Sequence, residues 1–329
     1  MASDTPPVSP ELTVPERTVP ELTVIIVSYN TKDLTIKALE TLYDTTKHTS
    51  FHTVVFDNAS SDGSVEAIAE AFPQVELIAS PDNLGFAKAN NIVAAEARTD
   101  WLLLLNPDTE CHAGAVDNLM AFMRANPQAG ITGGRTVFPD GSLNIASCWM
   151  RITPWSAFCS AFGLSSIFPR SSLFNPEAMG DWQRDTVREV DIVVGCFMMM
   201  SRDLWTQLDG FDLRYFMYGE EADMCLRAKA LGFQPAVTPE AQIMHLVGAS
   251  SKAQARKYSM IAKARMTLIR DHWAAPVVPF GALMMTIWAG SRALSLGLLA
   301  RLTGKKREAA AKWSEIWSDR RDWIKGYGA

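Results

Sequence analysis

The stretch Thr23-Val24-Ile25-Ile26-Val27-Ser28-Tyr29-Asn30 decides the fold of this chain of 329 residues. The run from Thr23 to Ser28 is rich in β-branched residues and shows no alternation of polar and apolar side chains. Such a run is typical of a strand that is covered by helices on both faces. Polar residues follow it at once, and residues 32–45 then predict a helix. The chain therefore begins with a strand–helix unit.

The same alternation continues through the first third of the chain. Further strands are predicted at residues 51–56, 75–79 and 101–105, with helices ending near Ala71 and spanning 86–97. Short connections between alternating strands and helices imply a parallel sheet with helices on both faces. Beyond an irregular stretch at 130–190, the sequence predicts a strand at 190–201, helices at 202–208 and 223–231, and a last strand at 235–245. The expected fold class is α/β, with a mixed, mostly parallel sheet.

Polar motifs follow the ends of the predicted strands, namely Ser28-Tyr29-Asn30, Asp57-Asn58, Asn83 and Asn106-Pro107-Asp108. In open α/β sheets, ligands bind beyond the carboxyl ends of the strands. Asp57 there is able to accept a hydrogen bond from the imide N–H of uracil or thymine, and Asp108 is able to bind a hard divalent cation. Both motifs also suit ordinary turns and helix starts, so neither is decisive alone.

Three carboxylates crowd together at Glu220, Glu221 and Asp223, followed by Arg227. Like charges this close raise one another's pKa, which suits a site that keeps one carboxylate as a general base. An acidic helix start would give the same pattern, because carboxylates favour the positive end of the helix dipole. Further along, His245 is either a neutral metal ligand or a structural, hydrogen-bonded histidine.

Taken together, these motifs resemble the family 2 glycosyltransferases of GT-A fold, in particular rhamnosyltransferase-like bacterial members. The resemblance covers about residues 22–250. It rests on the segments 24–30, 57–64, 83–91, 105–108, 195–198, 208–212 and 219–227, and on His245.

The resemblance implies roles for individual residues in nucleotide and metal binding. Val27, Tyr29 and Asp57 would hold the nucleotide base, while Asn83, Gly85 and Asn90 would line the nucleotide pocket. Asn106-Pro107-Asp108 stands at the position of the family's acidic metal motif, so that Asp108 and His245 would bind Mg²⁺ or Mn²⁺ on the diphosphate. Asn106 replaces the more common Asp there and leaves less negative charge for the cation.

The family's Glu-Asp pair is Glu220-Glu221 in this chain. Glu221 stands at the place of the general base, and its longer side chain leaves Glu220 and Asp223 as alternatives. The implied enzyme is an inverting, metal-dependent glycosyltransferase that moves a sugar from a nucleoside-diphosphate sugar, dTDP-rhamnose or a UDP-hexose. The acceptor would be a saccharide or a polyprenyl-linked saccharide in cell-surface or cell-wall polysaccharide biosynthesis.

Two other functions fit the sequence less well than a glycosyltransferase. A sugar-phosphate nucleotidyltransferase would want a Gly-rich loop with Arg and Lys after the first strand, and Ser28-Tyr29-Asn30-Thr31-Lys32 differs from that. A catalytically silent nucleotide-sugar or glycan-binding scaffold is disfavoured because Glu221 and Asp108 are both present.

The remaining composition concerns partners and location. The net charge of −5 argues against a nucleic-acid partner. The five cysteines have no paired short spacing, so we expect reduced thiols in a cytoplasmic compartment. Residues 1–21 carry no secretory signal and predict a disordered leader.

The C-terminal region, residues 251–329, is predicted to be helical. A basic amphipathic helix at 252–273 precedes an uncharged run at 274–291, which Pro276, Pro279 and Gly281 are expected to break. This pattern favours a peripheral position on the inner face of the cell membrane, with Trp273 and Trp288 as anchors. A helical hairpin packed on the catalytic domain, or on a second copy of the chain in a homo-oligomer, is the alternative.

Overall fold

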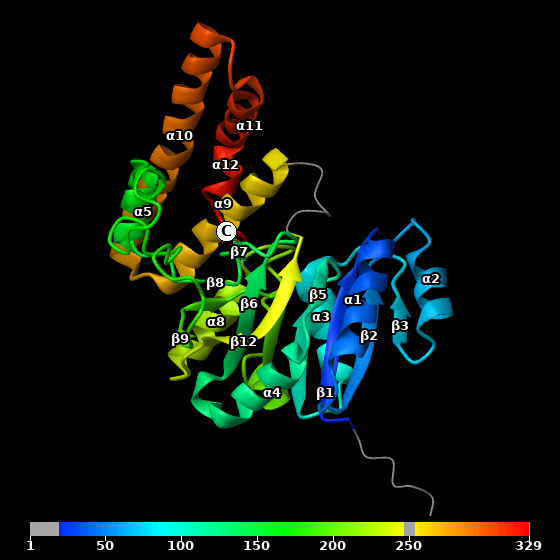
Figure 1. Cartoon of the computed structure of the whole chain (residues 1–329). Coiled ribbons are helices and arrows are strands. Elements are labelled where there is room, and N and C mark those ends of the chain that lie inside the picture. The colour runs from blue at the N-terminus through cyan, green and yellow to red at the C-terminus, as the bar shows by residue number, and fades with distance from the viewer. Residues whose placement is uncertain (1–19, 247–253, 329) are drawn as a thin grey trace, which may run out of the picture.

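The computed structural model describes residues 20–246 and 254–328 and places them in a sheet domain with a helical region against one end of it (Figure 1). Nearly all of the predicted leader, and the predicted boundary near residue 250, lie outside these ranges. The main sheet has the strand order β3-β2-β1-β4-β11-β6-β12-β5. Its first four strands are parallel, and β11 runs antiparallel between β4 and β6. The predicted α/β class and mostly parallel sheet are confirmed.

The strands and helices of the first half follow the expected alternation. The strands are β1 (Leu22–Ser28), β2 (Phe51–Asp57), β3 (Glu76–Ala79), β4 (Trp101–Leu105), β5 (Thr109–Cys111) and β6 (Ile131–Val137). The helices are α1 (Lys32–Thr45), α2 (Ser64–Ala71), α3 (Gly85–Glu96) and α4 (Ala115–Ala125), with a 3₁₀ turn at Pro127–Ala129.

The second half of the sheet domain is less regular. Short strands β7 (Leu143–Asn144), β8 (Cys148–Trp149), β9 (Arg188–Glu189) and β10 (Ile192–Val193) precede β11 (Phe197–Ser201) and β12 (Ala236–His245). The helices are α5 (Pro154–Ala161), α6 (Leu164–Ile167), α7 (Arg202–Gln207) and α8 (Glu220–Ala230). Two expectations were wrong in detail. The strand predicted at 190–201 is two strands, and the acidic helix begins at Glu220 instead of residue 223.

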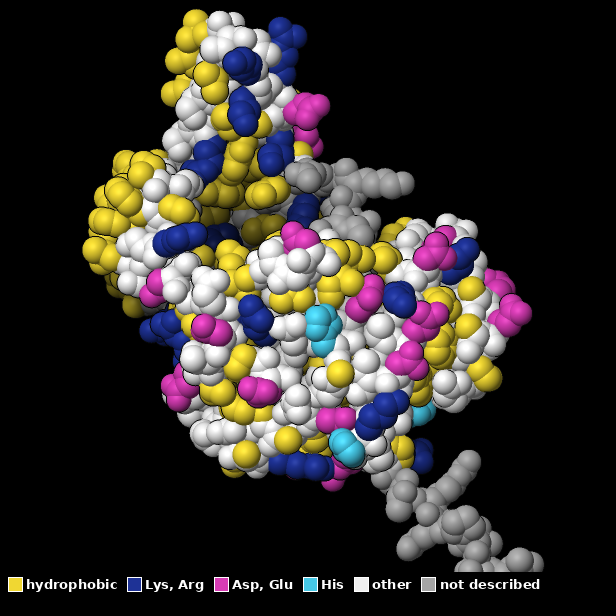
Figure 2. Space-filling model, in the orientation of Figure 1, with side chains coloured by type: hydrophobic (Ala, Val, Ile, Leu, Met, Phe, Trp, Pro, Cys, Tyr) yellow, Lys and Arg dark blue, Asp and Glu magenta, His cyan; other side chains and the backbone are white. Residues whose placement is uncertain are grey.

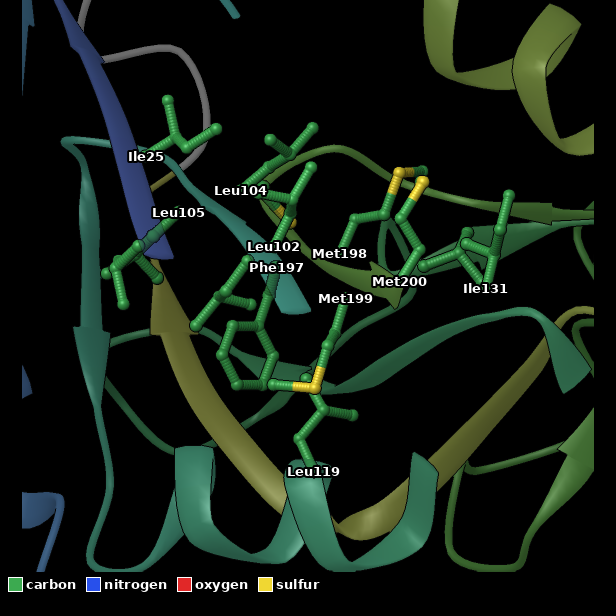
Figure 3. Close-up of a cluster of buried hydrophobic side chains, with 14 of the residues drawn as sticks. Ile25, Leu102, Leu104, Leu105, Leu119, Ile131, Phe197, Met198, Met199 and Met200 are labelled. Atoms are coloured by element: carbon green, nitrogen blue, oxygen red, sulfur yellow. The ribbon is translucent and has the colours of Figure 1, made fainter. Parts of the chain in front are cut away.

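The core lies where the central strands are covered on both faces. Figure 3 shows aliphatic side chains of β1 and β4 meeting Phe197 and Met198–Met200 of β11, with Leu119 of α4 below. Each of these side chains is almost fully buried. Burying one such side chain stabilises the fold by about 1.5–3 kcal/mol, so this cluster fixes the strand ends that carry the polar motifs.

The C-terminal region consists of α9 (Gln254–His272), α10 (Val278–Thr303), α11 (Arg307–Ser318) and α12 (Arg320–Trp323), with a 3₁₀ turn at Ala275–Val277. In Figure 1, α10 and α11 form a projecting hairpin, and α5 lies beside α10. A second hydrophobic core joins these helices, with Met266, Met284, Ile316 and Trp323 buried in it.

The predicted break in the uncharged run occurs at Pro276, in the 3₁₀ turn Ala275–Val277, but the breaks expected at Pro279 and Gly281 were wrong. Pro279 lies in the first turn of α10, where a helix has no need of its N–H group. Gly281 is buried, and a Cβ atom there would come within 2.7 Å of Ile269. Gly281 therefore lets α9 and α10 approach closely, and α10 continues as one helix to Thr303.

Candidate active site

The carboxyl ends of β1 to β4 meet at one edge of the sheet and bring the predicted nucleotide-binding residues together. Ser28 is the register partner of Asp57, and Asp57 in turn is the partner of Ala79 on β3. Asp57 is buried, and one of its carboxylate oxygens accepts from the backbone N–H of Ser60 at 2.8 Å. The other oxygen is buried without a partner. Because such a group is costly to leave unpaired, it is suited to accept a ligand N–H.

Val27 and Tyr29 lie at the same edge. Val27 is half-buried, whereas Tyr29 is about half exposed at 49% and presents an open aromatic ring. Asn30 has a positive φ of 52° and its side chain accepts from the backbone N–H of Ser61 at 2.8 Å. The loops after β1 and β2 are thus tied together beside Tyr29.

The segment from Asn83 to Asn90 forms a second wall of this edge. The side chain of Asn83 accepts from the N–H of Gly85 at 3.0 Å, and Gly85 has φ +79°. A Cβ atom on Gly85 would lie 2.5 Å from the carbonyl oxygen of Phe216. Phe86 also donates its N–H to that carbonyl at 3.1 Å. Gly85 is therefore the point where the nucleotide-side loop touches the loop that leads to the three carboxylates.

Asn90 uses one end of its side chain inside α3 and leaves the other end without a partner. Its side-chain amide donates to the carbonyl of Phe86, one turn earlier in α3, at 2.9 Å. Its side-chain oxygen is buried without a partner. The neighbouring Asn91 escaped the sequence prediction, yet it bonds both the N–H and the carbonyl of Phe211, at 2.9 and 2.8 Å. Asn91 therefore fastens the loop before α8 onto α3.

Asp108 and His245 come together from distant parts of the chain, as the predicted metal site requires. A carboxylate oxygen of Asp108 lies 3.2 Å from Nε2 of His245, and both side chains are buried. The backbone N–H of Asn106 donates to the carbonyl oxygen of Cys196 at 3.0 Å, and this bond holds the turn against the start of β11.

The donor set fits a divalent cation that is shared with a bound diphosphate. Carboxylate oxygen and imidazole nitrogen both suit Mn²⁺, and the nitrogen of His245 that faces the Asp108 carboxylate is Nε2. Within residues 20–246 and 254–328, no group of three or more His, Cys, Asp or Glu side chains is placed to hold a metal. The protein would therefore supply two ligands, and phosphate oxygens and water the rest.

The three carboxylates of α8 occupy different environments. Asp223 is buried; it forms an ion pair with Arg227 at 2.7 Å, and Nε2 of His272 on α9 lies within hydrogen-bond distance of its other carboxylate oxygen, at 2.9 Å. Burial alone would raise the pKa of Asp223, but His272 and Arg227 outweigh it and hold that pKa below its usual range. Arg227 also donates to the carbonyls of Leu208 and Gly210, so it fixes the position of α8. Asp223 is thus an ionised structural anchor.

Glu220 and Glu221 have raised pKa values. Burial raises the pKa of Glu220 well above its usual range, and the neighbouring Glu221 adds to the effect. One Glu220 oxygen has no partner. Burial likewise raises the pKa of Glu221, although it accepts from the N–H of Gly219 at 3.2 Å. Raised carboxylate pKa values of this kind are typical of catalytic acids and bases.

The turn before α8 is strained and tightly packed. Tyr218 and Gly219 have φ values of 71° and 95°. A Cβ atom on Gly219 would lie 2.8 Å from the side chain of Ala264 on α9. Helix α9 of the C-terminal region therefore contacts the turn that positions Glu221. Neither this contact nor the His272–Asp223 pair was predicted, and no sequence spacing indicates either.

A cavity of about 410 Å³ lies beside this turn, and Glu221 forms part of its wall. Neither Glu220 nor Asp223 is among the lining residues. The Cβ of Glu221 is also 3.8 Å from the position of a Cβ on Gly195, the residue before Cys196. Glu221 thus lines the cavity and also lies close to Gly195, whose neighbour Cys196 accepts the backbone N–H of Asn106.

Comparison with known proteins decides the family. The sequence profile of glycosyl transferase family 2 matches residues 23–206, which is more than half of the chain. The chain belongs to glycosyl transferase family 2. The resemblance to this family that was drawn from the motifs is confirmed.

The family 2 relatives include bacterial rhamnosyltransferases. The chain is 28% identical over 203 residues to the N-acetylglucosaminyl-diphospho-decaprenol L-rhamnosyltransferase of Mycobacterium tuberculosis. That alignment covers 57% of this chain and 64% of the relative, less than two thirds of its length. The chain is also 28% identical to the rhamnosyltransferase WbbL of Escherichia coli, with 68% of this chain and 82% of the relative covered.

A solved structure supports the fold. The mannosyltransferase PcManGT from Pyrobaculum calidifontis, in complex with GDP-Man and Mn²⁺, has a TM-score of 0.54 at 18% identity. The match covers 90% of this chain and 85% of that chain. At this coverage, the structural match also includes more than half of the C-terminal helical region.

Proposed function

We propose that this family 2 enzyme transfers a sugar with inversion from a nucleoside-diphosphate sugar, with Glu221 as the general base. The observation that carries the proposal is the position of Glu221, which lines the cavity and lies close to Gly195. The acceptor hydroxyl would lose its proton to Glu221 as its oxygen bonds to the anomeric carbon. The bond from that carbon to the diphosphate would break, and the nucleoside diphosphate would leave with the electron pair.

Glu221 is favoured over its two neighbours by their surroundings. Asp223 is held by Arg227 and His272, so its lone pairs are engaged and its low pKa makes it a weak base. Glu220 is buried and lies outside the cavity wall. Glu221 combines contact with the cavity and a raised pKa, which brings a carboxylate closer to the working pH of a general base.

Asp108 and His245 would hold the divalent cation, which when bound would stabilise charge on the departing diphosphate. The unpartnered oxygen of Asp57 supports a base with an imide N–H, such as thymine or uracil. The names of the two rhamnosyltransferase relatives support dTDP-rhamnose ahead of a UDP-hexose. A diphosphate-linked lipid acceptor, as in the name of the mycobacterial relative, would place the reaction in cell-surface polysaccharide synthesis.

A thermal-shift panel of dTDP, UDP, GDP and CDP, each with and without Mn²⁺, tests this donor site. We expect stabilisation by dTDP or UDP that requires Mn²⁺ and is lost in Asp108→Ala. Asp140→Ala, which changes an exposed acidic residue in the turn between β6 and β7, serves as the control and should keep the shift. Stabilisation that survives in Asp108→Ala would refute the metal assignment. Binding without any turnover in a donor and acceptor screen would favour the silent scaffold.

We further propose that the protein lies peripherally on the cytoplasmic face of the membrane. The segment Ala275–Thr303 is long and apolar enough to span a membrane, and 17% of its most apolar window is buried. Leu294 and Leu302 are 76% and 75% exposed. Four basic residues lie at the hairpin tip, where they would attract anionic lipid, namely Arg301, Lys305, Lys306 and Arg307. Figure 2 shows hydrophobic and basic side chains together at this tip.

Co-sedimentation with vesicles of phosphatidylglycerol and phosphatidylcholine tests the location. Leu294→Ser together with Leu302→Ser should weaken binding to the anionic vesicles, because both side chains are exposed apolar residues of α10. Leu231→Ser, at an exposed leucine beyond α8, is the control. Equal vesicle binding by all three proteins would reject the membrane surface. A change of mass in light scattering without lipid would instead assign α10 to contact between copies of the chain.

A further inference from the structure

The cavity beside Glu221 is built by parts of the chain that the donor motifs do not include. One wall is formed by α9, through Ile261, Arg265 and Leu268, and another by the segment from Trp149 to Ala178. The 410 Å³ volume is within the range of about 300–1,000 Å³ that is usual for small-molecule sites. Nothing in the donor chemistry requires this cavity.

Most of the cavity surface is apolar. Its apolar lining includes Trp149, Ile152, Phe174, Ile261 and Leu268, while hydroxyl groups come from Ser156, Ser160 and Ser165. A hydrocarbon placed here would gain about 25 cal/mol for each Å² of apolar surface removed from water. The lining therefore favours an apolar or amphiphilic occupant over a free sugar.

The charged groups away from Glu221 neutralise each other. Arg265 donates to both carboxylate oxygens of Glu177, at 2.8 and 3.0 Å. Burial would raise the pKa of Glu177, but Arg265 outweighs it and holds the pKa below the usual range. The pair thus stays ionised with no net charge.

The apolar wall continues to the molecular surface. The ring of Phe174 lies 5.1 Å from that of Phe168 and 6.4 Å from that of Trp155, measured between centroids. Phe168 and Trp155 are exposed, as are Phe162 and Ile167 beside them. Figure 2 shows hydrophobic side chains gathered where Figure 1 places α5. An apolar path therefore leads from Glu221 past Phe174 to the outside.

We propose that this cavity binds a hydrocarbon segment of an amphiphilic acceptor, whose hydroxyl reaches Glu221 while its chain leaves along Phe174 toward Phe168. The proposal rests on Glu221 acting as the base of the proposed transfer. It assigns recognition of the chain to the protein itself, through α9 and the 149–178 segment. A lipid tail that stayed wholly in the bilayer would leave this cavity unused.

Displacement of a neutral fluorescent hydrocarbon, N-phenyl-1-naphthylamine, from the full-length protein tests the proposal without turnover. n-Octyl β-D-glucoside, below its micelle concentration, should displace the probe at a concentration at least tenfold lower than glucose does. Ser165→Trp, which fills the cavity, and Ile261→Ser, which makes its wall polar, should each raise that concentration at least fivefold.

Each variant has a matched control outside the cavity. Ser166→Trp adds the same ring at an exposed neighbour, and Ile145→Ser removes the same side chain from an exposed position that does not line the cavity. Both controls should stay within twofold of the wild type. If Ser165→Trp fails to fold, Ile261→Ser decides. Equal displacement by glucose and octyl glucoside, or equal effects of lining and control variants, would overturn the proposal.

The nucleotide thermal shift of the same preparations separates this inference from the proposed function. A metal-dependent nucleotide shift with no chain-dependent displacement would reject the hydrocarbon site alone. Chain-dependent displacement without any nucleotide shift would leave the cavity assigned and reject the donor site.

Discussion

Replacing Glu221 by Gln should separate catalysis from stability. Gln has the same length and can still accept from the N–H of Gly219, now 3.2 Å from a Glu221 oxygen, but it cannot take a proton. General-base catalysis contributes about 10²–10⁴ in rate, or about 3–5 kcal/mol at 1.36 kcal/mol per decade. We expect kcat to fall by that factor, while the affinity for the nucleotide stays within twofold.

The same substitution should stabilise the protein at alkaline pH. Burial raises the pKa of Glu221, so the folded state binds its proton more tightly than the unfolded state, whose pKa is near 4.5. Wild-type stability therefore falls as the pH rises from 4.5 through the raised pKa, by about 1.4 kcal/mol for each pH unit that separates the folded and unfolded pKa values. Gln removes this loss. The variant should melt above the wild type at pH 8, and the difference should shrink as the pH falls toward 5.

Initial rates of nucleoside-diphosphate release and melting curves from pH 5 to 9 measure both effects. The wild-type rate should rise with pH through the raised pKa of Glu221, and the residual rate of the variant should lack that limb. Glu220→Gln is the matched control, because Glu220 lies outside the cavity wall, and its turnover should stay within fivefold. Turnover of Glu221→Gln within tenfold of the wild type, or a lower melting temperature at pH 8, would refute the assignment.

Three further substitutions test the framework around the site. Asp223→Asn should lower the free energy of unfolding in urea by about 3–5 kcal/mol, because Arg227 and His272 lose their partner. The contribution of Asp223 to stability is present above the usual pKa of Asp and is lost as the pH falls through its lowered folded pKa. Asp203→Asn, at an exposed residue, is the control and should leave the free energy of unfolding unchanged. Gly85→Ala should lower the affinity for the nucleotide at least tenfold in calorimetry, since its Cβ would meet Phe216. Gly63→Ala is the control, because Gly63 has nearly the same φ but its Cβ would meet nothing within 4 Å. This control should lower only the stability of the fold, by the backbone strain of about 1–2 kcal/mol. Gly281→Ala should lower the melting temperature, because its Cβ would lie 2.7 Å from Ile269. Gly297→Ala, on the same helix with open space around it, is the control and should stabilise the protein by up to about 1 kcal/mol.

The parts of the fold that could be predicted from sequence are those set by local patterns. The β-branched run at 23–28 and the leucine run at 101–105 mark buried strands, and both occur as expected. The edge where Asp57 and Asp108 lie follows from parallel pairing of strands whose order is limited by short connections. The break expected at Gly281 failed because local propensity cannot reveal that a neighbouring helix requires a small residue there.

The same distinction divides the candidate site. Asp57, Asn83 and Asp108 belong to short motifs that follow strand ends, so their place at one edge of the sheet could be predicted from sequence, while their roles toward a nucleotide stay predictions. Glu221 could be named but not separated from Asp223, because the partners of Asp223 include His272, which lies 49 residues away on another helix. The pairing of Arg265 with Glu177, across 88 residues, gives no local signal either.

These long-range contacts have a consequence for function. Ala264 packs against Gly219, His272 holds Asp223, and Ile261 and Leu268 line the cavity, all from α9. Yet α9 begins at Gln254, beyond the family match that ends at residue 206. The matched region therefore includes the edge formed by β1 to β4, whereas these α9 residues lie outside it. Two enzymes that share every donor motif can for this reason differ in acceptor, and exchanging α9 residues such as Ile261 should alter acceptor choice before donor choice.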